Sequence, residues 1–388
     1  MSTTPSRPST RSASSTPSFV TTEEQDLLRA TVRDLLASRA TSERVREVMM
    51  TDEAVDEVVW KELAELGLVG LMAAEDHGGA GAGFLELSIV AEELGRRLVP
   101  VPLLSSIVLG ASAVQAAGTG DQLAEVLPSV AAGATRLALA HLDADGRLTA
   151  DPGVRAERDG DGWVLDGTAG YVVDGHTADV VVTACVAAEG LALFLVPGEV
   201  DGLERTRVEV LDLTRPMAHL TYTQVRVPET ARLSGGDATA ALHAALAAGV
   251  VALACEQAGG AEQVLETTTT YAKERFQFGR AIGSFQAVKH RLADMLVQVE
   301  SARSAAYHAA RVLDAGDREE LAVAAPLAKS YCSEVYEQAA ADSIQLHGGI
   351  GFTWEHDAHL HLKRAKATKL LLGDPRHHRR LLGDALGL

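Results

Sequence analysis

The spacing of the apolar residues changes twice along this chain, and this change limits the possible folds more than any other feature. Over about 21–130 and again over 237–388, apolar residues recur every three or four positions, which is the period of a helix buried along one face. Over about 136–232 they form short β-rich runs separated by Gly, Asp and Pro. We therefore predict an α+β fold: helices, then a β-domain, then a helical bundle.

The expected elements follow from the same patterns. Thr22 caps a first helix whose apolar stripe begins at Leu27. Further helices are expected over 84–98, 103–117, 238–273, 285–315 and 319–346, and strands near 163–167, 171–173, 180–182, 192–196 and 220–227. The strands favour an antiparallel sandwich or barrel. We place the domains at 21–132, 133–234 and 235–388, after a Ser/Thr/Pro-rich tail, 1–20, that is expected to be disordered. A transit peptide is the less favoured interpretation of that tail.

Charge and cysteine content narrow the classes of function. The 388 residues carry 35 Lys and Arg against 53 Asp and Glu, a net charge of -18. This balance argues against a general nucleic-acid or membrane-surface binder, which needs a basic face. The three cysteines, Cys185, Cys255 and Cys332, are far apart and odd in number, so we expect no disulfide scaffold. No apolar run reaches membrane-spanning length, and we predict a soluble protein of a reducing compartment, the cytoplasm.

Two stretches carry candidate chemistry. In the first, a helix ends near Arg275 and Phe278, turns at Gly279 and continues behind Ser284. A guanidinium beside an aromatic ring suits a phosphate and an adenine, although a plain helical hairpin has the same spacing.

The second stretch, Gln345-Leu-His-Gly-Gly-Ile-Gly-Phe352, ends a long helix with three glycines in four positions. A simple helix end needs only one glycine, so the other two indicate a close backbone approach to a ligand.

Together the two stretches resemble the C-terminal half of the acyl-CoA dehydrogenase family. Glu75-Asp-His-Gly-Gly and Ala91-Glu-Glu-Leu-Gly look like the family's N-terminal helical domain, and the β-rich region ending at Val227-Pro228 looks like its middle domain. The resemblance covers about 21–388. It implies a four-helix-bundle C-terminal domain, a dimer of dimers, FAD, α,β-desaturation of an acyl-CoA, and an electron-transfer flavoprotein as electron acceptor. The FAD-binding residues that it implies are Arg275, Phe278, Phe285, Gln286, Gln345, Gly348 and Gly349.

The catalytic base of the family has no counterpart at either position that the resemblance indicates. Desaturation needs a carboxylate to remove the α-proton. The usual glutamate position is Leu372 here, and the alternative position falls at or near Gly249. Glu256 and Asp374 are nearby acids, and we interpret each as structural rather than as a displaced base.

The elements with which a subunit of this family contacts the flavin in its own active site are also altered. The loop of the form Thr-Glu-Pro followed by Ala-Gly-Ser-Asp is replaced by a different segment that begins at His141. The flavin-side Trp and the hydroxyl residue two positions later correspond to Tyr171 and Val173. An aromatic face is kept and a hydroxyl is lost.

These losses and retentions form one pattern. In the family, one subunit's β-domain and base hold the flavin ring, and the neighbour supplies the Phe-Gln pair and the glycine loop. This chain keeps the Phe-Gln pair and the glycine loop, which a subunit supplies to its neighbour. It therefore resembles the base-lacking subunit of heteromeric bacterial acyl-CoA dehydrogenases of lipid or steroid metabolism. Such subunits form heterotetramers with a homologous catalytic subunit. The alternatives are a self-sufficient homo-oligomeric enzyme with a displaced base, and a non-catalytic thioester-binding homologue.

A metal site at His356, His359 and His361 is not expected, since these spacings do not bring three imidazoles to one point of a helix. The basic cluster 376–380 is also compatible with an ordinary helix end.

Overall fold

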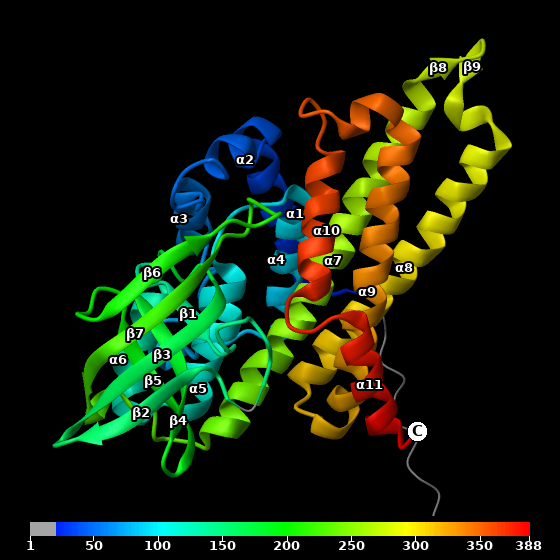
Figure 1. Ribbon diagram of the computed structural model, residues 1–388. Helices are drawn as coiled ribbons and strands as arrows, with labels where there is room; N and C mark the ends of the chain where they lie inside the picture. Colours follow the sequence, from blue (N-terminus) through cyan, green and yellow to red (C-terminus); the bar gives the residue numbers. More distant parts are fainter. Residues whose placement is uncertain (1–20, 150) are drawn as a thin grey trace, which may run out of the picture.

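The computed structural model describes residues 21–149 and 151–388, and Figure 1 shows their arrangement. A twisted sheet lies beside a bundle of long helices, and the N-terminal helices pack against both. The tail predicted to be disordered, 1–20, falls outside the described residues, and the domain boundaries stay a prediction.

The N-terminal region is helical, as its periodicity predicts. Thr22, Thr41, Asp56 and Thr119 each accept a backbone N–H with the side chain, which satisfies donors that the first helical turn leaves free. The elements are α1 Glu23–Arg39, α2 Ser42–Val48, α3 Glu57–Glu65, η1 Glu75–His77, α4 Phe84–Arg97, η2 Leu103–Ala111, α5 Ser112–Ala117 and α6 Gly120–Ala131. The helix expected over 103–117 is divided, because η2 is a π-helix.

The middle strands form one seven-stranded sheet with the order β1-β4-β2-β3-β7-β6, in which β5 also pairs with β4. The strands are β1 Leu137–Ala140, β2 Val154–Asp159, β3 Gly162–Val173, β4 Val180–Ala187, β5 Gly190–Pro197, β6 Leu203–Val208 and β7 Met217–Pro228. Most pairs are antiparallel, but β1 and β2 run parallel to β4, which corrects the purely antiparallel expectation. β1 is buried at all four positions and β4 at most of its positions, so these two strands lack the alternating burial of an antiparallel strand with one solvated face.

The C-terminal region contains the long helices that were expected. The elements are η3 Glu229–Ala231, α7 Ala238–Glu274, β8 Phe276–Gln277, β9 Arg280–Ala281, η4 Ile282–Ser284, α8 Gln286–Asp314, α9 Arg318–His347, η5 Gly348–Phe352, α10 Ala358–Leu370 and α11 Pro375–Leu386. α7 is long and apolar enough to cross a membrane by length and composition. In this fold it is a core helix, since it is largely buried against α4, α8 and α9.

Glycines bring α4 and α7 into close contact. A Cβ atom at Gly259 would lie 2.0 Å from the backbone oxygen of Glu92, and one at Gly95 would lie 2.2 Å from that of Glu256. Only glycine fits at such a crossing. This contact fixes the position of the α7 segment that carries Gly249 and Glu256.

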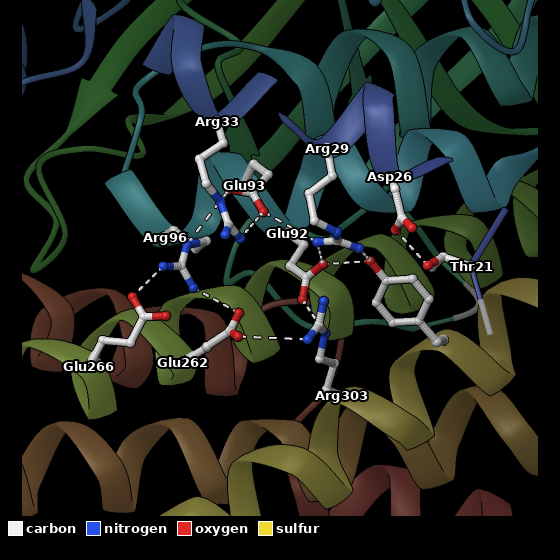
Figure 2. A network of polar contacts seen from close by, with 11 residues as sticks. Thr21, Asp26, Arg29, Arg33, Glu92, Glu93, Arg96, Glu262, Glu266 and Arg303 are labelled. Atoms are coloured by element: carbon white, nitrogen blue, oxygen red, sulfur yellow. Dashed lines mark hydrogen bonds and ion pairs between the residues drawn. The ribbon is translucent and has the colours of Figure 1, made fainter. Parts of the chain in front are cut away.

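A charge network centred on the buried Glu92 and Glu93 braces the same crossing (Figure 2). Arg33 Nη2 donates to Glu93 Oε1 at 2.7 Å, and Arg96 Nη1 donates to Glu262 Oε2 at 2.7 Å. The fully buried Glu92 is paired with Arg29 of α1 and Arg303 of α8, and the network also includes Tyr307 and Glu266. Helices α1, α4, α7 and α8 are thus joined by opposite charges that compensate one another.

Candidate active-site region and cofactor face

The two predicted base positions face one another in the folded chain. A Cβ atom at Gly249 would lie 2.6 Å from Leu109 Cδ2 and 2.9 Å from Leu372 Cδ1. Leu372 follows α10 and Leu109 belongs to η2, so three separate elements meet here. Apolar side chains fill the space into which a carboxylate at position 249 would extend, and none of the three residues can accept a proton.

The turn after α10 has an unusual backbone. Leu372 has φ 59° and Gly373 has φ 100°, so both residues lie in the region that favours glycine. His378 Nε2 donates to the Leu372 carbonyl at 2.9 Å. A strained position occupied by leucine is held by its surroundings rather than by its own preference.

Lys329 of α9 provides part of that support, and it was not identified from the sequence. Its side chain is fully buried and Nζ donates to the carbonyls of Thr368, Lys369 and Gly373 at 3.0, 3.3 and 3.1 Å. Burial lowers the pKa of Lys329 to about 7. A single lysine among the small and apolar residues of this helix was the only signal in the sequence.

Glu256 is engaged in two ion pairs. Its carboxylate accepts from Arg215 Nη2 at 2.5 Å and from Arg364 Nη1 at 2.7 Å. Burial by itself raises the pKa of Glu256, but the two guanidinium groups outweigh burial and hold the pKa below its usual value. A carboxylate held in this way is a weak base, which supports the structural interpretation of Glu256.

Asp374 also has a structural role. Its Oδ1 accepts the backbone N–H of His377 at 2.7 Å and caps α11. Helix capping accounts for an aspartate directly before Pro375.

The predicted flavin-side aromatic residue, Tyr171, is in contact with its own loop and is 40% exposed. Tyr171 lies in a bulge of β3 with φ 51°, and its ring contacts the His219 ring edge to face at 5.0 Å. A Cβ atom at Gly146 would lie 2.4 Å from the Tyr171 ring, so the loop that replaces the family's flavin loop packs on this ring. Val173 is buried.

The residues predicted to bind cofactor lie together at one end of the helical bundle. α7 and α9 end there and α8 begins there (Figure 1). The Tyr271 hydroxyl donates to the His347 carbonyl at 3.3 Å, which joins the two predicted stretches. Of the seven predicted residues, Phe285 is half-buried. The other six are exposed: Arg275, Phe278, Gln286, Gln345, Gly348 and Gly349.

This end of the bundle has an open backbone and an exposed apolar surface. Gly348 has φ 64°, and a Cβ atom at Gly348 or Gly349 would meet nothing within 4 Å. Phe276, Phe278 and Phe352 are 64%, 92% and 80% exposed. Exposed aromatic side chains beside open glycines are typical of a surface that another molecule covers.

The three histidines considered as metal ligands contact different neighbouring side chains. His356 stacks on His347 with ring centroids 4.2 Å apart, and His361 Nδ1 is 2.8 Å from the Tyr336 hydroxyl. His359 packs against Trp354. Within residues 21–149 and 151–388, no group of three or more His, Cys, Asp or Glu side chains is arranged to hold a metal ion.

Comparison with known proteins gives consistent matches along the chain. Residues 22–134 match the family model described as "Acyl-CoA dehydrogenase, N-terminal domain", and residues 238–387 match "Acyl-CoA dehydrogenase, C-terminal domain". The chain is 37% identical to acyl-CoA dehydrogenase IpdE2 of Mycobacterium tuberculosis, over 91% of this chain and 94% of that protein.

Two solved structures are also similar. A variant of the Tcur3481-Tcur3483 steroid ACAD has a TM-score of 0.85 and 34% identity, over 94% of this chain and 98% of the other. The ChsE4-ChsE5 complex from Mycobacterium tuberculosis has a TM-score of 0.87 and 30% identity, over 96% of this chain and 99% of the other.

Proposed function

Because this chain belongs to the acyl-CoA dehydrogenase family, we propose that it is a subunit without a catalytic base that completes the FAD site of a homologous catalytic partner. The heteromer desaturates an acyl-CoA thioester, and this chain contributes binding rather than proton abstraction.

The observation that carries the proposal is the contact of Gly249, Leu372 and Leu109. Neither position that the resemblance assigns to the glutamate carries a carboxylate, and the side chains of Leu109 and Leu372 fill the space beside Gly249. Glu256 and Asp374 are occupied by ion pairs and by helix capping. These contacts support the proposal that another chain abstracts the proton.

The surface at the end of the bundle fits one half of a dinucleotide site. Gln286 and Gln345 offer exposed amides, Arg275 offers a guanidinium to a phosphate, and the open Gly348 and Gly349 allow close backbone approach. When bound, FAD supplies the acceptor for the hydride that leaves the substrate β-carbon. The residues of this chain hold and orient the cofactor, and the exposed aromatic side chains exclude water once the partner packs against them.

The relatives support the same proposal. Two of the similar structures carry two protein names each, ChsE4-ChsE5 and Tcur3481-Tcur3483, and the second of these is described as a steroid ACAD. We extend both features to this chain and propose that it forms a heteromer whose substrate is a bulky acyl-CoA of the steroid type. The electron-transfer flavoprotein as acceptor and the cytoplasmic location stay predictions.

The test is acyl-CoA desaturation by the co-purified pair. Gln286→Ala and Gln345→Ala in this chain are expected to lower bound FAD and turnover at least tenfold, because each removes an amide that this proposal assigns to hydrogen bonds with the cofactor. Asp374→Asn is the matched control: asparagine also caps a helix, so turnover is expected to be unchanged. Loss of turnover in Asp374→Asn with full flavin would instead identify Asp374 as the base and contradict the proposal.

A further inference from the structure

A narrow, mainly aliphatic pocket lies inside this chain between α4, η2, α7 and α10. Leu94, Val108 and Ala252 are among its walls, and its volume is sufficient for about one water molecule. Its polar residues are Arg215, Glu256 and Arg364. The pocket is thus apolar with a few polar groups, and its size admits a single small polar group rather than a whole ligand.

Arg215 has an unused donor beside this pocket. It follows β6 in the loop before β7 and is 9% exposed. Nη2 is paired with Glu256, but Nη1 is buried and has no hydrogen-bond partner within the described part of the chain. A buried N–H without an acceptor is costly, so Nη1 is a candidate donor to a ligand oxygen.

The charges around Arg215 decide which kind of oxygen fits. The positive charges of Arg215 and Arg364 are already balanced by Glu256 and Asp212, which pair with them. Asp174, whose charge also acts on Arg215, is a further carboxyl nearby. An additional carboxylate would therefore be buried without a compensating charge, whereas a ketone or hydroxyl oxygen needs none.

The pocket lies close to the positions from which a base would act. Ala252 and Glu256 follow Gly249 by one and two helical turns on the same face of α7, roughly 5 and 10 Å along the helix axis. Val108 in the pocket wall precedes Leu109, which contacts position 249. This wall is the π-helix η2, a rare form of helix that is frequent at functional sites.

We propose that this pocket is an acyl subsite in which Arg215 Nη1 donates a hydrogen bond to a ketone or hydroxyl oxygen of the acyl group, and that this chain binds the ligand without turnover. The oxygen takes the space of about one water, and the proposal requires η2 side chains to shift so that the carbon skeleton fits behind it. This inference rests on the proposed function in two respects only: that the ligand is an acyl thioester, and that this chain alone does not convert it.

The experiment is calorimetric titration of the full chain with two matched thioesters, 4-oxocyclohexanecarboxyl-CoA and cyclohexanecarboxyl-CoA. The ketone is expected to bind at least tenfold more tightly, because a site built to donate a hydrogen bond discriminates against a ligand without an acceptor. A third probe, 4-carboxycyclohexanecarboxyl-CoA, is expected to bind more weakly than the ketone.

Three variants assign the effect to the pocket. Arg215→Lys keeps a positive charge for Glu256 but removes the guanidinium donors, so the preference for the ketone is expected to fall below twofold. Val108→Phe fills the pocket and is expected to weaken both ligands. Arg226→Lys, at an exposed arginine paired with Asp159, is the control and is expected to retain the preference. Thermal melting verifies that each variant is folded.

The proposal is overturned if the two matched thioesters bind equally, if neither binds, if the carboxylate binds best, or if folded Arg215→Lys keeps the preference. These results do not depend on the partner subunit. A ketone preference in a chain that forms no heteromer would contradict the proposed function and leave this subsite intact. If the heteromer binds flavin but this chain shows no preference for the ketone, the subsite is contradicted and the proposed function is left intact.

Discussion

At the scale of single residues, the turn after α10 shows how one buried cation shapes the candidate site. Lys329 donates to three carbonyls around Leu372 and Gly373, and burial lowers its pKa to about 7. Below this pH the buried amine carries a charge that burial disfavours.

The pH dependence of stability tests this assignment. The ordinary lysine pKa is 10.5, so between about pH 7 and 10.5 the unfolded chain binds the additional proton, and stability rises with pH. The unfolding free energy of wild type minus that of Lys329→Met is expected to increase by roughly 2 to 4 kcal/mol from pH 7 to pH 10. Chemical denaturation of both proteins measures it, and a flat or falling difference would show that Lys329 stays charged in the fold.

Residue by residue, the sequence was informative where a motif has a fixed spacing. The resemblance predicted Leu372 and a position at or near Gly249 as the base positions, and this stays a prediction. Their mutual contact and the role of Leu109 depend on tertiary packing between α7, η2 and the turn after α10. Arg215 was not identified, since it lies in a loop with no motif around it. Its unused donor is visible only once its partners are known.

At the scale of elements, the crossing of α4 and α7 determines where the site lies. Gly259→Ala would place a methyl group on the Glu92 carbonyl and is expected to lower the unfolding free energy by about 2 kcal/mol or more. Gly383→Ala is the matched control within a helix, because nothing lies within 4 Å of the added methyl group. It is expected to stabilise by up to about 1 kcal/mol. Equal effects in thermal or denaturant unfolding would refute the close-contact argument.

The charge network at this crossing makes a separate prediction. Glu92→Gln leaves Arg29 and Arg303 with less compensation inside the protein, and is expected to cost about 3 kcal/mol of stability. Glu65→Gln breaks the exposed pair with Lys61 and is expected to change stability by less than about 0.5 kcal/mol. Denaturant unfolding of the two variants compares them, and similar losses would mean that burial of the network adds nothing.

The elements themselves were largely predictable, for reasons that the exceptions make clear. Long helices such as α7 and α9 repeat their apolar spacing over many turns, so the period is unambiguous. Strands β1, β2 and β6 were missed. Exposed and half-exposed residues dominate β2 and β6, so little apolar pattern remains, and β1 has only four residues. The parallel pairing of β1 with β4 depends on chain connections that the residue pattern does not record.

At the scale of the whole molecule, the chain has two unlike faces. Leu109 and Leu372 fill the space beside Gly249, whereas the end of the bundle exposes glycines, amides and aromatic rings. This asymmetry is what a subunit that gives its binding surface to a partner requires, and a self-sufficient enzyme would need both faces to be functional.

The most direct test of this account is the amount of FAD bound per chain, measured by flavin absorbance for the protein purified alone and co-purified with its catalytic homologue. The account predicts little flavin on the isolated chain, and one FAD per pair of unlike chains together with acyl-CoA desaturation. One FAD per chain, with desaturation by the isolated protein, would contradict it.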